Sequence, residues 1–174
     1  MNIANKLTLL RAALVPVFLI ILYWGFPYSD MVAFAVFVIA GVTDIIDGHI
    51  ARKYNLVTDF GKFMDPLADK MLVVAAMCWL VQTGEMGGWV LALVLLREFA
   101  VSGMRLVAVT QGIVIAAALS GKIKTASTVV CLGFMLAFNI HWLNLVCQII
   151  ILASTLYSGI EYFIKNKEIG RAHV

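Results

Sequence analysis

Long apolar runs are the feature of this chain that most restricts how it can fold. Hydrophobic residues make up 63% of its 174 positions and charged residues 13%, whereas soluble domains are about 45–50% apolar and about 25% charged. A helix that crosses a bilayer needs about 17–25 mainly apolar residues. Six such runs follow one another, at Leu7–Pro27, Met31–Ala51, Pro66–Thr83, Gly88–Thr110, Ile123–Ile140 and Asn144–Ile164. The sequence therefore predicts an all-α integral membrane protein with six transmembrane helices in a single domain, residues 1–174.

The distribution of Lys and Arg predicts the orientation of these helices. The connections after the first, third and fifth runs contain no Lys or Arg. The termini and the other connections contain Lys6, Arg11, Arg52, Lys53, Lys62, Lys70, Lys122, Lys124, Lys165, Lys167 and Arg171. Because cytoplasmic loops of membrane proteins carry the excess of positive charge, both termini and the segment between the second and third runs are expected in the cytoplasm.

Two pairs of aspartates flank that segment. Asp44 and Asp47 end the second run, and Asp65 and Asp69 open the third, so each pair shares one helix face. A charge at the bilayer centre costs about 2.5–3.5 kcal/mol, and like charges side by side raise the cost unless cations compensate them. Four carboxylates without His or Cys suit Mg²⁺, Mn²⁺ or Ca²⁺, and paired divalent ions support in-line displacement at phosphorus. Alternatively, Asp65-Pro66 is a helix N-cap followed by the first helical residue.

Small and cationic residues accompany the aspartates. Gly48 and Ala51 lie on the face of Asp44 and Asp47 and would let a ligand approach the helix. Arg52 is a fixed cation that suits a phosphate oxygen. Asp59 is interpreted as a solvated turn or cap residue, and His49 as an interfacial histidine on the opposite face of the helix.

A second group of charges lies in the fourth run and after it. Arg97 and Arg105 are separated by a little over two helical turns and nearly share a face, and an arginine inside a membrane helix indicates a functional site. Alternatively, Arg97 pairs with Glu98, although adjacent residues face apart, or with an aspartate of the motif. Lys122 and Lys124 follow in the loop SGKIKT, where a positive-inside loop is the simpler explanation for either lysine alone. Taken together, the four cations predict a basic pocket for an anionic second substrate.

The aspartates and their neighbours form one pattern, Asp44-x2-Asp47-Gly48-x2-Ala51-Arg52-x8-Gly61-x3-Asp65-x3-Asp69. In this pattern and in its six runs, the chain resembles the CDP-alcohol phosphatidyltransferase family. The resemblance implies that family's fold and two bound divalent ions, Mg²⁺ or Mn²⁺, held by the four aspartates. It also implies that Asp69 is the general base for the acceptor alcohol. The residues that would line the cytidine diphosphate pocket are Gly48, Ala51, Arg52 and Gly61.

Further segments resemble the bacterial branch of the family that uses glycerol 3-phosphate as acceptor: Asn5-x2-Thr8-x2-Arg11, NLVTDFGKFMDPLADK, REFAVSGMR, GKIKT and GIEYF. This resemblance implies a transfer from CDP-diacylglycerol to sn-glycerol 3-phosphate, with release of CMP. Thr8 and Arg11 would then contact the CDP-lipid. Arg97, Arg105, Lys122 and Lys124 would hold the acceptor phosphate. It further implies a homodimer among the lipids of the bacterial inner membrane, with its active site facing the cytoplasm and no nucleic-acid partner.

Two alternatives stay open. The first is a sibling enzyme of the family with another acceptor, such as inositol phosphate or phosphatidylglycerol. The second is a divalent-cation transporter in which the carboxylates form the permeation site. Acidic residues of transporters are expected near the membrane midplane, in broken helices and often in paired repeats, whereas here they cluster at one membrane face.

Overall fold

Six helices make up the described part of the chain. The computed structural model describes the backbone of residues 3–53, 59–110, 112 and 118–167, and the side chains of residues 10, 12–43, 70–110, 112 and 118–167. The helices are α1 (Ile3–Trp24), α2 (Ser29–Lys53), α3 (Asp59–Gln82), α4 (Gly88–Thr110), α5 (Leu119–Phe138) and α6 (His141–Lys165). Each contains most of one predicted apolar run, so the all-α fold class is confirmed for this part.

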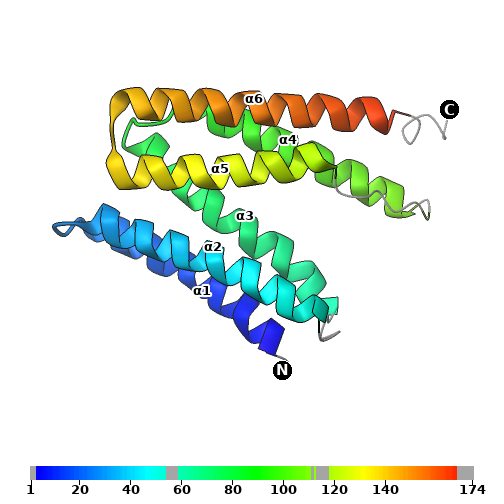
Figure 1. Cartoon of the computed structure of the whole chain (residues 1–174), viewed down its shortest axis with the longest axis horizontal. Coiled ribbons are helices and arrows are strands. Elements are labelled where there is room, and N and C mark those ends of the chain that lie inside the picture. Colours follow the sequence, from blue (N-terminus) through cyan, green and yellow to red (C-terminus); the bar gives the residue numbers. More distant parts are fainter. Residues whose placement is uncertain (1–2, 54–58, 111, 113–117, 168–174) are drawn as a thin grey trace.

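The helices form two packed groups joined through α2 and α3. α1 packs against α2 and α3, whereas α6 packs against α4 and α5. Contacts of α2 and α3 with α5 and of α3 with α4 connect the groups. Figure 1 shows that the turns after α1, α3 and α5 lie at one end of the bundle, on the left, while the start of α1 and the end of α6 lie towards the other end. The charge-free connections predicted from the sequence therefore share one end.

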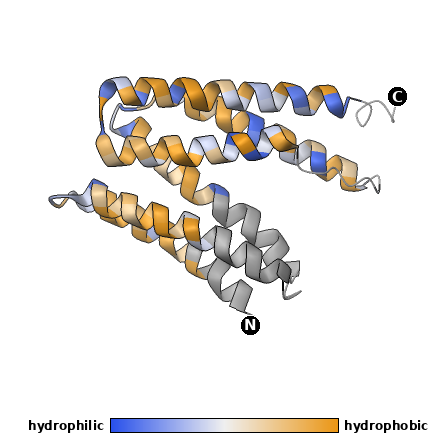
Figure 2. Ribbon diagram, viewed as in Figure 1, coloured by the Kyte–Doolittle hydropathy of each residue, from blue (hydrophilic) through white to orange (hydrophobic). Residues whose placement is uncertain are grey.

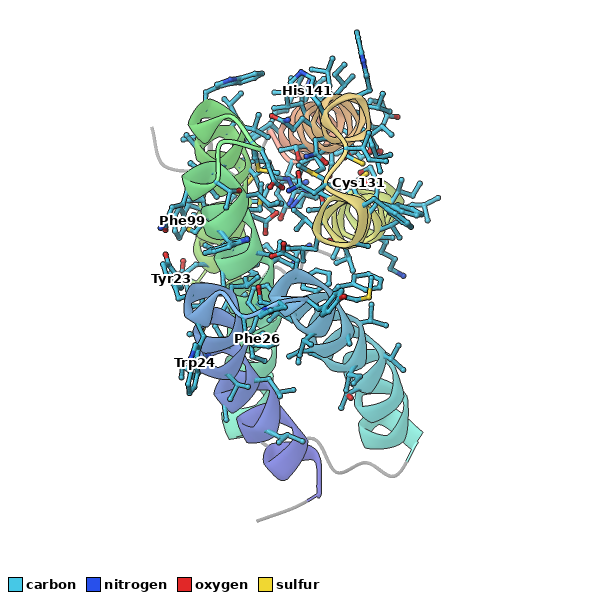
Figure 3. All side chains as sticks on the ribbon, turned by 90° about the vertical axis from the view of Figure 1, so that its left-hand side faces the viewer. Tyr23, Trp24, Phe26, Phe99, Cys131 and His141 are labelled. Carbon is cyan, nitrogen blue, oxygen red and sulfur yellow. The ribbon has the colours of Figure 1, made fainter. Side chains whose placement is uncertain are left out.

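Apolar side chains fill the space between the helices and also cover much of the outer surface. Phe18, Met77 and Leu132 belong to one continuous buried core. On the outside, Trp24 and Phe99 point away from the bundle (Figure 3) and are 78% and 71% exposed. Figure 2 shows hydrophobic residues along most of the described helices, and many of the large ones are exposed. Such an extensive apolar exterior indicates lipid contact, because soluble monomers rarely expose large apolar patches.

Length and composition single out two helices as membrane spans. Within the described residues, α5 and α6 are long and apolar enough to cross a membrane. The described parts of α1, α2 and α3 contain shorter apolar stretches, Ala12–Trp24, Ser29–Thr43 and Lys70–Gln82. α4 is a continuous helix, but its apolar sequence contains the charged residues Arg97, Glu98 and Arg105. These findings indicate a membrane protein, and crossing by all six helices stays a prediction.

Two turns show why the helices end where they do. Gly84, at φ +80°, adopts a left-handed conformation that favours glycine. Asn139 caps α5 at φ 40°, and its N–H donates to the carbonyl of Met135 at 3.2 Å. Gln148 of α6 fixes the turn between α3 and α4, because its amide accepts from Gly87 N–H and donates to the Glu85 carbonyl, both at 3.0 Å.

Three predicted local structures are wrong. α3 begins at Asp59, so Asp59 belongs to a helix and Asp65-Pro66 is not an N-cap followed by a first helical residue. α5 begins at Leu119, so Lys122 and Lys124 are helical and not part of a loop. The reason is the same in each case: hydropathy marks where apolar residues begin, whereas backbone hydrogen bonding continues through polar residues.

Candidate active site

A cavity of about 980 Å³ lies between α2, α4 and α5 and also reaches α3. Its polar part is lined by Lys70, Arg97, Glu98, Ser102, Arg105 and Lys122. Its apolar part follows α2 and α5, where it is lined by Phe34, Phe37, Val38, Val130, Phe134 and Phe138. The cavity is therefore amphipathic, with charged groups near the start of α5 and apolar side chains along its length.

Glu98 is the centre of the charged part. Its Oε1 lies 2.8 Å from Arg97 Nη1 and 2.8 Å from Lys124 Nζ, and its Oε2 lies 3.1 Å from Lys70 Nζ. These cations come from α4, α5 and α3. Figure 3 shows nitrogen and oxygen atoms gathered between α4 and the α5–α6 pair, and Figure 2 shows hydrophilic residues where α4 and α5 overlap in that view. The carboxylate of Glu98 thus forms ion pairs with cations from three helices.

Arg97 is held from several sides. Its Nη2 donates to Ser158 Oγ of α6 at 2.6 Å, while Nη1 donates to Glu98. A Cβ at Gly159 would lie 3.3 Å from Arg97 Cγ, so the arginine stem passes directly over this glycine. The sequence argument against an Arg97–Glu98 pair is wrong, because the arginine side chain is long enough to reach its neighbour around the helix. Arg97 Nε is buried and has no hydrogen-bond partner among the described residues.

The other predicted cations lie around this centre with different exposures. Arg105 is exposed, lines the cavity and lies over the Tyr162 ring, with Cζ 5.7 Å from the ring centroid. This is a cation–π distance. Lys122 is exposed and lines the cavity. Lys124 is buried, with 6% side-chain exposure, and reaches the cluster through Glu98. The structure therefore brings the four predicted cations together around the polar part of the cavity.

Four polar residues of this site were not predicted: Lys70, Glu98, Ser102 and Ser158. In the sequence, Lys70 was used only to predict the orientation in the membrane. In the structure, its Nζ lies 3.0 Å from Ser102 Oγ and also close to Glu98. Glu98 was considered only as a competing partner for Arg97. A signal existed in the segment REFAVS, where a glutamate and a serine accompany the arginine inside an apolar run. It could not reveal that Lys70 of α3 reaches the same point.

The motif residues belong to α1, α2 and α3, but their side chains lie outside the described residues. They are Thr8 and Arg11 of α1, Asp44, Asp47, Gly48, Ala51 and Arg52 of α2, and Gly61, Asp65 and Asp69 of α3. The two helices that carry the aspartates are in contact. Lys70, whose side chain is described, immediately follows Asp69. The cationic cluster therefore lies beside the chain segment where the motif ends, and the roles of the motif residues stay predictions.

The apolar exterior and the amphipathic cavity lined by α2, α3, α4 and α5 place this chain in the class of helical membrane proteins. The chain belongs to the CDP-alcohol phosphatidyltransferase family, whose model matches residues 1–157. The family generally uses divalent metal ions.

Curated relatives cover nearly the whole chain. A protein of Bacillus subtilis (strain 168) named CDP-diacylglycerol–glycerol-3-phosphate 3-phosphatidyltransferase is 42% identical, over 96% of this chain and 96% of the relative. A protein of the same name from Rickettsia bellii is 37% identical, over 93% of each chain. A probable phosphatidylglycerophosphate synthase of Mycobacterium tuberculosis is 40% identical, over 92% of this chain and 79% of the relative. The family predicted from the aspartate pattern is thus confirmed.

Proposed function

We propose that this protein transfers the phosphatidyl group of CDP-diacylglycerol to sn-glycerol 3-phosphate, giving phosphatidylglycerophosphate and CMP. The observation that carries the proposal is the amphipathic cavity, whose cationic end lies beside the motif helices and whose apolar part follows α2 and α5. The names of the relatives support the same reaction. A site that joins a lipid to a phosphorylated alcohol needs both an apolar and a cationic surface.

The cations of the cavity suit a phosphorylated acceptor. Arg97, Arg105, Lys122 and Lys124 gather around the polar part of the cavity. A phosphate monoester carries about −1.5 to −2 charge at neutral pH, and arginine and lysine are its usual protein partners. Glu98 offsets only part of this positive charge, and a neutral or cationic alcohol would leave the excess without a counterion. The acceptor phosphate therefore binds here, with its hydroxyl turned towards the aspartates of α3.

The apolar part of the cavity suits the acyl chains of the lipid substrate. It runs along α5 as far as Phe138 and is bordered on the other side by Phe34, Phe37 and Val38 of α2. The tails enter this part from the bilayer, between α2 and α5. The CDP group then lies against the motif, in contact with Thr8, Arg11, Gly48, Ala51, Arg52 and Gly61.

The aspartates carry the chemistry. Their oxygen-only donor set fits Mg²⁺ or Mn²⁺, and Asp44, Asp47, Asp65 and Asp69 would hold two such ions. When bound, these ions supply charge neutralisation at the phosphoryl oxygens. Asp69 accepts the proton of the acceptor's 1-hydroxyl. A bond forms between this oxygen and the lipid-side phosphorus, and the bond from that phosphorus to the CMP oxygen breaks.

The membrane arrangement follows the charge distribution. All six helices cross the bacterial inner membrane as a single domain. Both termini and the active site face the cytoplasm, and the water-soluble glycerol 3-phosphate enters from that side. The positive-inside rule supports this orientation. The protein works as a homodimer, in keeping with the resemblance to its family.

The reaction is tested with purified protein in detergent. CDP-diacylglycerol is offered with glycerol 3-phosphate, inositol phosphate, phosphatidylglycerol or free glycerol, and CMP release is measured with and without EDTA. We expect release with glycerol 3-phosphate, loss on chelation and recovery with Mg²⁺ or Mn²⁺. Release with another acceptor alone would identify a sibling enzyme. Metal flux into proteoliposomes without CDP-lipid would instead identify a transporter.

Asp69→Asn tests the general base. Because an amide cannot accept the proton, we expect turnover to fall by about 10²–10⁴-fold. Binding of CDP should be retained in part, since three carboxylates remain, and isothermal titration with CDP and Mg²⁺ measures it. Full turnover in this variant would remove Asp69 from the proposed role.

A further inference from the structure

The arrangement around Glu98 is unusual for a site that binds an anion. A carboxylate occupies the middle of the cationic cluster and contacts Arg97 and Lys124 through one oxygen and Lys70 through the other. Glu98 lines the cavity itself, so it faces the space that an anionic ligand would enter. Its function must be compatible with phosphate binding next to it.

Glu98 compensates the repulsion among the three cations. They come from α3, α4 and α5 and share one carboxylate, and like charges gathered in this way repel each other in a partly buried site. The side chain of Lys124 is 6% exposed and that of Arg97 is 13% exposed, so water screens them little. The carboxylate offsets this repulsion and fixes where the three positive groups meet.

The cluster as a whole stays positive. Lys70, Arg97 and Lys124 contribute three positive charges and Glu98 one negative charge, which leaves a net charge of +2. This value matches the charge of a phosphate monoester, about −1.5 to −2 at neutral pH. Arg97 Nε is also a buried donor without a partner among the described residues, and a ligand oxygen would satisfy it.

Lys70 differs from the other two cations in its freedom to move. Its side chain is 43% exposed and lines the cavity, where it also donates to Ser102 Oγ at 3.0 Å. The side chain therefore stays nearly half exposed while it makes both contacts. Lys70 can therefore turn onto an incoming anion while Arg97 and Lys124 stay held by Glu98 and Ser158.

We propose that Glu98 is the positioning residue of the acceptor-phosphate subsite, and that Lys70, which it draws over from α3, is a further ligand of the acceptor phosphate. This inference rests on the proposed function for the identity of the acceptor. The subsite itself is defined by chemistry, as a place for a phosphate dianion bounded by α3, α4 and α5.

Binding of inorganic phosphate tests the subsite without any enzymatic assay. The probe is the phosphate-dependent rise in melting temperature of the purified protein in detergent, with EDTA present and with chloride at equal ionic strength as reference. We expect the phosphate concentration that gives half of the rise in melting temperature to increase by at least about tenfold in Glu98→Gln and in Lys70→Met. Lys70→Met removes a positive charge from the subsite. Glu98→Gln adds net positive charge but removes the carboxylate that holds the three cations in position.

Glu161 and Lys165 provide matched controls. They form an ion pair on α6 outside the residues that line the cavity. Glu161→Gln and Lys165→Met should respond to phosphate like the unmodified protein. An unchanged response in Glu98→Gln would overturn the positioning role, and an unchanged response in Lys70→Met would overturn the role of Lys70. Equal losses in the control variants would show that the probe reports surface charge, which would also overturn the proposal.

Steady-state kinetics separate positioning from general destabilisation. In Glu98→Gln we expect KM for glycerol 3-phosphate to rise at least about tenfold, with KM for CDP-diacylglycerol within about twofold of the unmodified enzyme. Glu98→Asp and Lys70→Arg keep the charges and should recover part of the loss. A fall in kcat alone, or equal changes in both KM values, would contradict the proposal.

The two measurements distinguish a folding defect, a wrong acceptor and a wrong subsite from one another. If Glu98→Gln does not fold, Glu98→Asp and the more exposed Lys70→Met decide the question in the same two measurements. If glycerol 3-phosphate is not a substrate but phosphate binding is lost in the variants as expected, the subsite stands and the proposed acceptor is wrong. If the acceptor is correct but phosphate binding is unchanged, only the present inference fails.

Discussion

At the scale of single residues, Gly159 shows how closely the site is packed. A Cβ at this position would lie 3.3 Å from Arg97 Cγ, and the arginine cannot easily give way, because Glu98 and Ser158 hold its guanidinium. We expect Gly159→Ala to raise KM for the acceptor about three- to tenfold, equal to about 0.7–1.4 kcal/mol. Steady-state kinetics with varied glycerol 3-phosphate measure this effect.

Gly103 supplies the control for that substitution. It lies in α4, and a Cβ there would meet nothing within 4 Å. Gly103→Ala should leave both KM values unchanged and favour the helix slightly, since alanine has the higher helix propensity. Equal kinetic effects of the two substitutions would mean that Gly159 has no special relation to Arg97.

The same residues show what a sequence can and cannot predict about a site. Arg97 and Arg105 were found because cations are costly inside apolar runs. The aspartate pattern was found because its spacing is fixed along two adjacent helices. Lys70 was missed because only the packing of α3 against α4 brings it to Glu98. The periodicity of a helix predicts which face packs, but it does not predict which side chain of another helix will be met there.

At the scale of elements, the path along α2 and α5 can be blocked without touching the charged residues. Ala137 lines the apolar part of the cavity, near the end of α5. We expect Ala137→Trp to fill this part and to raise KM at least about fivefold for long-chain CDP-diacylglycerol, because an indole occupies volume that the acyl chain needs. The dioctanoyl analogue, with its shorter tails, should be affected less.

Ala153 is a suitable comparison, because it is exposed on α6 and does not line the cavity. Ala153→Trp should leave the chain-length dependence unchanged. An Ala137→Trp enzyme with the same preference among long and short lipids as the unmodified one would contradict the placement of the tails between α2 and α5.

Glu85, in the turn between α3 and α4, is an acid whose ionisation affects the free energy of unfolding. Burial raises the pKa of Glu85, and the negative charge of Asp30 adds to the increase, while hydrogen bonds from Asn139 and Thr83 oppose it. Between the ordinary and the raised pKa, the folded protein keeps a proton that the unfolded chain has released. The stability is therefore expected to fall as the pH rises through this window.

Glu85→Gln removes this titration. Near pH 4, where the carboxyl is mostly protonated in both states, the melting temperatures of the two proteins should be close; towards about pH 7 the variant should become the more stable. Thermal unfolding in detergent across this range measures the difference. Parallel curves for the two proteins would show that burial of Glu85 has no effect on folding.

Helix ends are the part of each element that hydropathy predicts least well. For α4 the apolar run and the helix coincide at Gly88–Thr110, where turns with glycine bound both. For α3 the helix begins at Asp59, well before the run. Polar residues at the start of this helix are compatible with helical backbone, so hydropathy alone could not place its first turn.

At the scale of the whole molecule, alternation of charged and uncharged connections predicted the arrangement of the helix ends. The turns after α1, α3 and α5 do lie together at one end of the bundle (Figure 1). The amphipathic cavity, in contrast, could not be predicted, because residues from four helices line it, α2, α3, α4 and α5. Only the three-dimensional packing joins an apolar wall on α2 to cations on α3, α4 and α5.

The orientation in the membrane gives the last prediction. Pro27 lies in the turn after α1, and Lys167 follows α6 at the opposite end of the bundle; both are exposed. In a background without the native cysteines Cys78, Cys131 and Cys147, we expect Pro27→Cys to react with a membrane-impermeant maleimide in intact spheroplasts. Lys167→Cys should react only after permeabilisation, because positively charged segments stay in the cytoplasm. The reverse labelling pattern would place the cationic end of the cavity outside the cell, away from any cytoplasmic supply of a phosphorylated acceptor, and would contradict the proposed reaction as well as the orientation.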